Sequence, residues 1–206
     1  MRVNPVAYSN FKLGDVIKQF GLILKDKNDL FSDIAEVEYS DYLDFTIRYN
    51  LPIAGEINTE KARSEMIIAP ILLELRRKLN DRISLFSGNE FNVDFEKGLN
   101  GACDFLISLS ESQLLISAPV ITIVEAKKED IISGLGQCVA EMLGAQLFNE
   151  REGNEIQTIY GVVTSGTVWR FLKLEDKVIY IDVVEYYIKD VKKIIGILLS
   201  AIKQYI

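Results

Sequence analysis

Three charged residues stand at the ends of two neighbouring apolar runs, where their types and spacing could do chemistry. Glu125 and Lys127 close the run 119–124, and Asp104 stands near the start of the preceding run, 102–110. The side chains of a strand alternate between its two faces, so Glu125 and Lys127 share one face. If the two strands are antiparallel, the start of one lies beside the end of the other. We therefore expect Asp104 to lie opposite Glu125.

Two carboxylates placed this close repel each other. At about 4 Å and an effective dielectric constant near 20, the repulsion is on the order of 4 kcal/mol. Either one carboxylate takes up a proton, or a cation lies between them. A divalent ion such as Mg²⁺ or Mn²⁺ suits these oxygen ligands and could bind a phosphate oxygen and a water. Lys127 could then orient that water or stabilise developing negative charge. A plain ion pair between Glu125 and Lys127 is the structural alternative.

Two helices could bring further polar side chains to the same place. Glu65 is the only charge on an otherwise apolar helical stripe, which directs it toward the core; the alternative is a helix N-terminal charge. Gln137 follows the Glu125 strand on a helix whose small residues permit close approach to the sheet; the alternative is a core amide bonded to the backbone. We expect Glu141, one turn later, to pair with a neighbouring cation. The stripe consists of Glu65, Ile68, Leu72, Leu75 and Leu79.

The composition excludes several kinds of site. The 206 residues contain no histidine, which rules out Ser-His-Asp triads, Cys–His pairs and His-ligated zinc. The formal net charge of −7 argues against general binding of nucleic acid, which favours basic proteins. Cys103 and Cys138 lack the spacing of a disulfide framework or a metal site, so we expect both to be buried. Without a signal-peptide pattern or an apolar run of about 20 residues, we expect a cytoplasmic protein that does not span a membrane.

The remaining pattern predicts an α/β or α+β fold with a mixed central β-sheet flanked by helices. Residues 1–58 are predicted to be a helical N-terminal extension packed on the core, with a helix that Pro52 stops, and residues 59–206 the main domain. Thr59 can cap the clearest helix, and Pro70 should bend it. We expect the final helix to cover its own core, with a homodimer contact as the alternative. Predicted helices are 10–24, 38–52, 59–80, 130–150 and 186–206, and predicted strands are 82–88, 90–96, 102–110, 119–127, 158–166, 167–175 and 177–185.

The stretches ACDFLIS at 102–108 and PVITIVEAKK at 119–128 resemble the PD-(D/E)XK nuclease superfamily, whose fold many restriction enzymes and repair nucleases share. The resemblance covers about residues 59–174 and implies a restriction-endonuclease-like core. It makes Asp104 and Glu125 ligands of Mg²⁺ or Mn²⁺ and Lys127 the catalytic lysine. Glu65 and Gln137 become supporting residues of the same site.

The function that this resemblance implies is metal-dependent hydrolysis of a nucleic acid, with DNA as the expected substrate. Cys103 stands where the superfamily's name-giving proline would be, at a position that varies. The acidic net charge favours an alternative, in which the same fold binds nucleic acid or a protein partner without turnover. Because a Glu-x-Lys pattern also arises by chance, a third interpretation is an unrelated α/β domain. One such chance match is Glu175–Lys177, expected in a hairpin turn, and Asp190–Lys192 in the last helix is a similar acidic-x-Lys pattern.

Overall fold

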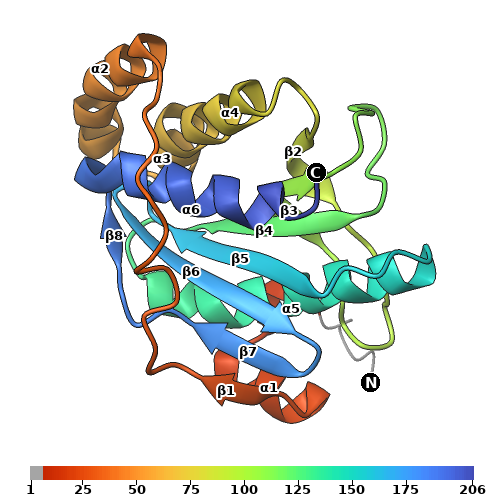
Figure 1. Ribbon diagram of the computed structural model, residues 1–206. Helices are drawn as coiled ribbons and strands as arrows, with labels where there is room; N and C mark the ends of the chain where they lie inside the picture. Colours follow the sequence, from red (N-terminus) through yellow and green to blue (C-terminus); the bar gives the residue numbers. More distant parts are fainter. Residues whose placement is uncertain (1–6) are drawn as a thin grey trace.

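The computed structural model describes residues 7–206 as an α+β fold built on one mixed sheet of eight strands (Figure 1). The strands lie in the order β1-β7-β6-β5-β4-β3-β2, and β8 pairs with β6 outside that path. The β3–β4 and β5–β6 pairs are antiparallel, whereas β4–β5 and β1–β7 are parallel. The strands are β1 Ile23–Lys25, β2 Ser84–Glu90, β3 Ala102–Ser108, β4 Val120–Ala126, β5 Thr158–Thr164, β6 Val168–Glu175, β7 Val178–Ile181 and β8 Tyr186–Tyr187.

Helices cover both faces of this sheet (Figure 1). α1 and α5 lie on one face and α2, α4 and α6 on the other, so the sheet separates two hydrophobic clusters. Residues 8–22 contribute to the first cluster and residues 31–54 to the second, so the N-terminal segment packs on both faces. The helices are α1 Leu13–Phe20, α2 Asp41–Ile57, α3 Glu60–Arg63, the π-helical turn η2 Ser64–Ile68, α4 Ala69–Lys78, α5 Ile131–Arg151 and α6 Val191–Lys203, with 3₁₀ turns η1 Tyr8–Asn10 and η3 Ile188–Asp190.

β4 is an interior strand of the sheet, and all seven of its residues are buried. β3 and β5 flank it, α5 covers one of its faces, and the layer of α4 and α6 covers the other. Ile123 belongs to the cluster under α5, whereas Val124 and Ala126 belong to the opposite cluster. The alternation of side chains therefore places Glu125 on the α5 face. α5 then connects β4 to its parallel neighbour β5, as a parallel pair requires.

Several predicted elements differ from the structure, and the helix expected over residues 186–206 begins only at Val191, after β8 and η3. The helix expected over residues 10–24 ends at Phe20, because Gly21 takes the left-handed conformation (φ 64°) that terminates helices, and β1 follows. The N-terminal segment is therefore not purely helical, since β1 extends the sheet beside β7. The predicted strand 90–96 is wrong. The chain does not turn before it, because β2 continues its pairing with β3 as far as Glu90.

Pro52 does not stop α2, which continues to Ile57. A proline inside a helix removes one N–H and leaves the carbonyl four residues earlier without its donor. Here that carbonyl belongs to Arg48, which lies on the exposed side of the helix, where water can bond to it. The predicted end at Pro52 is therefore wrong by about one and a half turns.

The helix predicted over residues 59–80 begins at its expected cap but is not one regular helix. The Thr59 hydroxyl accepts a hydrogen bond from the Ala62 N–H at 3.1 Å. Residues 64–68 then form a π-helical turn, in which the Ala69 N–H reaches back to the carbonyl of Ser64. Such a turn holds more residues than an α-helical one, so it rotates the side chains before it relative to those after it.

Pro70 follows the π-helical turn and couples it to α2. Proline has no N–H, so Pro70 cannot bond to the carbonyl of Met66, four residues earlier. Asn50 of α2 takes that place, because its Nδ2 donates to the Met66 carbonyl oxygen at 2.9 Å. By leaving the Met66 carbonyl free, the proline allows this hydrogen bond, which fixes α2 against η2 and α4.

α5 is the one described helix that is long and apolar enough to cross a membrane, contrary to the expected absence of such a run. Of its most apolar window, 67% is buried inside the fold. The helix between two β-strands of a central sheet needs this composition, so α5 serves as a core helix here. A cytoplasmic location stays a prediction.

Replacing Asn50 by Ala should lower the free energy of unfolding by about 1–3 kcal/mol, because the Met66 carbonyl then loses its donor. Thr46→Ala is the matched control on the same helix, since the Thr46 hydroxyl bonds only to the nearby Tyr42 carbonyl at an exposed position. It should change stability by about 0.5 kcal/mol or less. Urea unfolding followed by circular dichroism measures both, and equal effects of the two variants would contradict the coupling.

Candidate active site

The register of β3 and β4 brings Asp104 and Glu125 together. Phe105 pairs with Val124 in the antiparallel ladder, and one further step sets Asp104 opposite Glu125. The Asp104 carboxylate is held against β4, because its Oδ2 accepts a hydrogen bond from the Ala126 N–H at 2.8 Å. The antiparallel arrangement that the sequence analysis assumed for these strands is confirmed.

Lys127 follows β4 directly, and its side chain returns to Glu125. The backbone N–H of Lys127 donates to the Thr164 carbonyl at 2.8 Å, which extends the pairing with β5 by one residue. Its ammonium group forms an ion pair with Glu125 Oε1. The Glu125 side chain is 1% exposed and that of Lys127 is 21% exposed, so the carboxylate lies deeper and the ammonium nearer to solvent.

Gln137 of α5 completes this group of side chains. Its Nε2 donates to Glu125 Oε2 at 2.9 Å, and its Oε1 accepts from Lys127 Nζ at 3.4 Å. The same Nε2 also donates to Glu141 Oε1 at 3.1 Å. Gln137 therefore bonds three ionisable side chains rather than the backbone. Both carboxylate oxygens of Glu125 have a protein partner.

Small residues let α5 approach its neighbours closely, although not all of them face the sheet. A Cβ atom on Gly134 would lie 2.7 Å from a side chain of β5 and 3.0 Å from Lys127 Cε, so only glycine fits between helix and site. Gly136 and Gly144 instead face residues 8–13 of the N-terminal segment. The helix is thus packed tightly on both sides.

Burial and neighbouring carboxylates set the charges in this site. Burial, followed by the negative charge of Asp104, raises the pKa of Glu125 to about 8, although Lys127 opposes the shift. Burial lowers the pKa of Lys127, but the carboxylates of Glu125, Glu60 and Asp104 outweigh that effect, so the pKa is raised and the ammonium keeps its charge. A proton therefore competes for Glu125 near neutral pH.

Glu65 does not point at the core, so that part of the prediction is wrong. Its side chain is 60% exposed and pairs with Lys61 at 2.8 Å. The cause is the π-helical turn at 64–68, which rotates Glu65 off the apolar stripe. Instead of Glu65, Glu60 in the first turn of α3 is the helical carboxylate whose charge adds to burial and to the charge of Asp104 in raising the pKa of Glu125. The only signal for Glu60 in the sequence is its place just after a capping residue.

Glu65 still borders the site, because it lines a cavity of about 230 Å³ together with Asp104. Among residues 7–206, no three carboxylates or thiols converge closely enough to ligate one ion. A cation here would therefore have two protein carboxylates, Asp104 and Glu125, and would keep several water or substrate ligands. The cavity is lined by Glu60, Lys61, Ser64, Glu65, Ser87, Gly88, Asp104 and Ala126.

Glu141 lies behind the site and forms no ion pair with any cation of residues 7–206, which corrects the expected pairing. Its carboxylate is fully buried and bonds to the Gln137 amide. Its Oε2 has no hydrogen-bond partner among residues 7–206. Burial and then the charge of Glu125 raise the pKa of Glu141 well above its usual range. The site therefore has a second, inner carboxylate that the sequence pattern did not assign to it.

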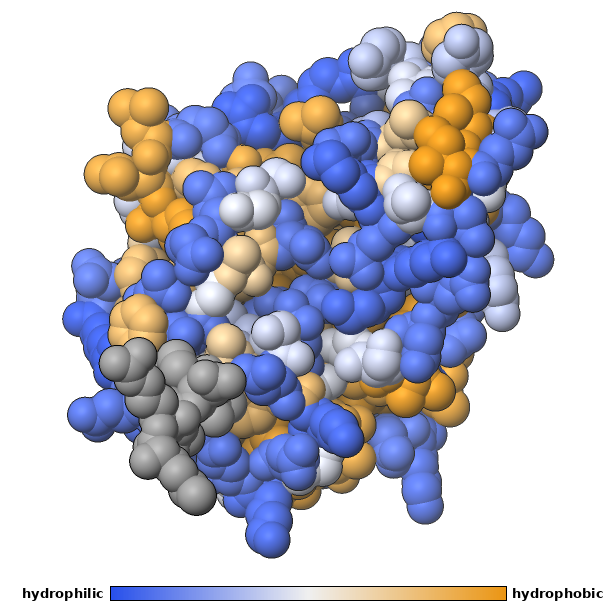
Figure 2. All heavy atoms as spheres, turned by 180° about the vertical axis from the view of Figure 1, so that it is seen from behind, coloured by the Kyte–Doolittle hydropathy of each residue, from blue (hydrophilic) through white to orange (hydrophobic). Residues whose placement is uncertain are grey.

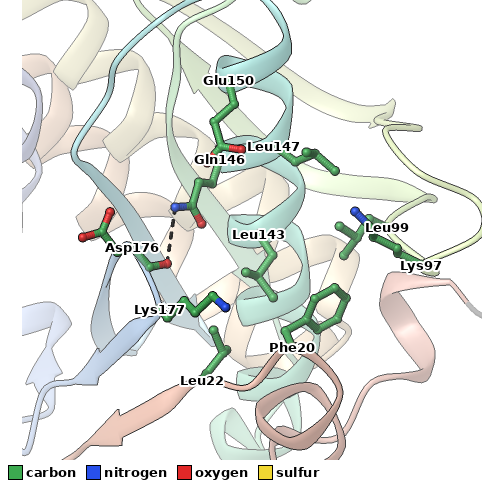
Figure 3. Close-up of a pocket in the computed structure, with 10 residues that line it drawn as sticks. All are labelled: Phe20, Leu22, Lys97, Leu99, Leu143, Gln146, Leu147, Glu150, Asp176 and Lys177. Carbon is green, nitrogen blue, oxygen red and sulfur yellow. Dashed lines mark hydrogen bonds between the residues drawn. The ribbon is translucent and has the colours of Figure 1, made fainter.

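A different cavity, of about 390 Å³, lies further along α5 and contains none of the predicted site residues (Figure 3). Leu143 and Leu147 of α5 and Phe20 of α1 supply its apolar side chains. Gln146 crosses it to donate to the backbone carbonyl of Asp176 at 3.3 Å. Gln146 lies nine residues after Gln137, about 13 Å along the helix axis, so this cavity is separate from the carboxylate site.

Comparisons of this chain with protein-family models, with curated proteins and with solved structures found no match.

Stability should depend on pH through Glu125. Its pKa is about 8 when folded and near 4.5 when unfolded, so between these values the folded state holds a proton that the unfolded state has lost. Raising the pH from about 5 to 8 should therefore lower the free energy of unfolding, by about 1.4 kcal/mol per unit for one proton. The loss is absent below this window and complete above it.

The difference in the pH dependence of unfolding free energy between wild type and Glu125→Gln reports the Glu125 proton, because glutamine does not titrate. Urea unfolding in chelator-treated buffer at several pH values should give a shallower decline for Glu125→Gln. Glu175→Gln, at the end of β6, serves as the control and should keep the wild-type slope. Identical slopes for wild type and Glu125→Gln would show that Glu125 does not carry the proton.

Proposed function

We propose that this chain is a divalent-metal-dependent nuclease with a restriction-endonuclease-like core in residues 59–206, and that its substrate is a nucleic acid, with DNA favoured. The observation that carries the proposal is the convergence of Asp104, Glu125 and Lys127 from adjacent strands, with Gln137 bonded to both members of the ion pair. Neither stability nor simple packing requires a buried carboxylate next to a half-buried one beside a cavity.

The order of elements supports the same proposal. A helix precedes the site, then β3 and β4 form an antiparallel pair, α5 crosses over, and β5 returns parallel to β4. The superfamily resemblance implies an acidic residue at one strand start and Glu-x-Lys on the next strand, with a helix glutamine following. Here those positions are occupied by Asp104, Glu125, Lys127 and Gln137.

The residues present fit a Mg²⁺ or Mn²⁺ ion. Both donors are hard carboxylate oxygens, and Mg²⁺ is commonly held by one or two carboxylates with substrate phosphates and waters. Burial and then the charge of Asp104 raise the pKa of Glu125, and a bound cation would favour its ionised form. When bound, such an ion polarises a phosphate oxygen and lowers the pKa of a water.

The chain's own residues have separable tasks in this proposal. Asp104 is fixed by the Ala126 N–H, so one of its oxygens has a set direction. Lys127 keeps its ammonium charge near solvent, where it can orient an attacking water and stabilise negative charge on a phosphate. Gln137 holds the second oxygen of Glu125, which keeps the carboxylate from rotating.

The variants Asp104→Asn and Lys127→Ala should each lower Mg²⁺-dependent cleavage of DNA or RNA at least about 100-fold, because each removes a charge at the reacting phosphate. Their circular dichroism spectra should stay those of a folded protein. Cleavage of fluorescent single- and double-stranded oligonucleotides, with and without chelator, measures the effect.

The chain offers a matched control for both changes. Glu175–Lys177 has the same residue types at the β6–β7 turn, and Asp176→Asn and Lys177→Ala repeat the two chemical substitutions there. These controls should cleave at the wild-type rate. Undiminished cleavage in both Asp104→Asn and Lys127→Ala would contradict the assignment of these residues to an active site.

A second candidate function is binding of nucleic acid or a protein partner without turnover. The specific observation in its favour is that both oxygens of Glu125 are already bonded, by Lys127 and Gln137. A metal ion would have to displace or share these contacts. The net charge of −7 also weakens electrostatic attraction to phosphate.

Calorimetric titration with Mn²⁺ separates the two candidates without any substrate. A nuclease site should bind Mn²⁺, and Glu125→Gln should weaken the binding at least about tenfold, because one charged ligand is lost. Glu175→Gln should bind as the wild type does. Absence of a wild-type binding signal at millimolar Mn²⁺ would favour the binding module, whereas an unchanged signal in Glu125→Gln would exclude Glu125 as a ligand.

A further inference from the structure

α2 carries a continuous apolar stripe on the side that faces away from the protein. Its members follow one another at helical spacing and are 70%, 68%, 63%, 37% and 50% exposed in chain order. The neighbouring side of the same helix is buried through Leu43, Ile47 and Ala54. α2 is therefore apolar on two sides, and its own fold covers only one. The stripe consists of Tyr42, Phe45, Tyr49, Ile53 and Ile57.

The apolar surface continues from α2 onto α4. Leu73 of α4 is 56% exposed, and a groove of about 160 Å³ separates it from the stripe. Figure 2 shows hydrophobic side chains gathered at the upper right of the molecule, over α2, among hydrophilic ones. We name this surface, made of the stripe and Leu73, the α2 face. The groove is lined by Tyr42, Thr46, Pro70, Leu73, Glu74 and Arg77.

The area of the α2 face is large for a surface left in water. Its three aromatic side chains, at about two-thirds exposure, present roughly 400 Å², and the aliphatic ones bring the total to roughly 600 Å². That equals the largest apolar patches of ordinary monomers, about 300–600 Å². Two such faces together would bury about 1,200 Å², which reaches the range of specific protein interfaces.

The face carries both a ridge and a groove. Phe45 and Tyr49 stack with centroids 5.9 Å apart and planes inclined by 14°, so they form one ridge. The groove between Tyr42 and Leu73 runs beside this ridge. A ridge and a groove on one surface fit each other after a two-fold rotation, which is the geometry of an isologous dimer.

The charges around the face select against nucleic acid. α2 contains Asp41, Asp44 and Glu56 against a single basic residue, Arg48, which is paired with Asp44 at 2.9 Å. A phosphate backbone laid along this helix would meet net negative charge. Exposed aromatic residues, by contrast, are the residue type that concentrates binding energy in protein interfaces.

We propose that the α2 face binds the α2 face of a second copy of this chain, with the two-fold axis between the Phe45–Tyr49 ridge and the groove. Asn58, the residue that ends α2, donates to Glu129 at 3.3 Å in the loop after Lys127. Pairing of α2 would therefore restrain this loop, which follows Lys127 of the proposed active site. It would not merge the two sites, because each belongs to its own chain.

Sedimentation velocity of the full chain over roughly 1–100 µM tests this, since interfaces of this size dissociate in that range. The wild type should shift from monomer to dimer as the concentration rises. Phe45→Ser and Tyr49→Ser should each weaken the association at least tenfold. Both residues are exposed, so the variants should keep the wild-type melting curve. The association should persist in 0.5 M salt, because it is apolar.

Leu114→Ser is the matched control, since Leu114 is 92% exposed on the loop between β3 and β4, outside the α2 face. It should dimerise as the wild type does. A wild type that stays monomeric at 100 µM overturns the proposal, and so does a dimer that Phe45→Ser and Tyr49→Ser leave intact. If the wild type stays monomeric but binds a single-stranded oligonucleotide that these variants lose, the face is a nucleic-acid surface and the dimer is excluded.

Discussion

One constraint governs this structure: a carboxylate must be held out of water at the end of a strand that is buried along its whole length. Glu125 is 1% exposed, and an ionised group taken out of water without partners costs several kcal/mol. Its partners are the ammonium of Lys127 and the amide of Gln137, which belong to different elements. β4 and α5 must therefore be fixed to each other within the tolerance of a hydrogen bond. The glycine at position 134 permits this, because any larger side chain would meet Lys127 and β5.

The same requirement explains why the N-terminal segment packs on both faces of the sheet. α5 is held from the sheet side by β4 and β5, and from the other side by residues 8–13, which Gly136 and Gly144 admit. The later part of the segment, α2, crosses to the opposite face and is fastened through Asn50 to the carbonyl that Pro70 leaves free. The helix that carries Glu60 and the helix that carries Gln137 thus receive support from one continuous stretch of chain.

Much of the site could be predicted because it depends on strand periodicity and on one register. Glu125 and Lys127 share a face through simple alternation, and Asp104 meets them because consecutive strands pair antiparallel. The direction of the Glu65 side chain could not be predicted. The prediction assumed about 3.6 residues per turn throughout the helix, whereas residues 64–68 form a π-helical turn that the sequence pattern does not indicate. The end of α2 was misplaced for a related reason. A proline leaves the carbonyl four residues earlier without a donor, and the helix can continue if water reaches that carbonyl. Whether water reaches it is a property of the fold and not of the local sequence.

The inner carboxylate is the feature that stability explains least. Replacing buried polar groups by apolar residues of similar volume is often neutral or stabilising, yet Glu141 lies fully buried with Oε2 unpaired among residues 7–206. The one hydrogen bond that the Glu141 side chain forms within the described part of the chain, with Gln137, has a directional effect. The Nε2 of Gln137 donates to Glu141 as well as to Glu125, and a flipped amide would instead turn this NH₂ group toward the ammonium of Lys127. Its Oε1 therefore stays directed at Lys127. Glu141 helps to fix the orientation of the Gln137 amide, and the amide in turn fixes the Glu125 carboxylate and the Lys127 ammonium. A fold that keeps this series of contacts at a cost in stability uses it for something other than stability.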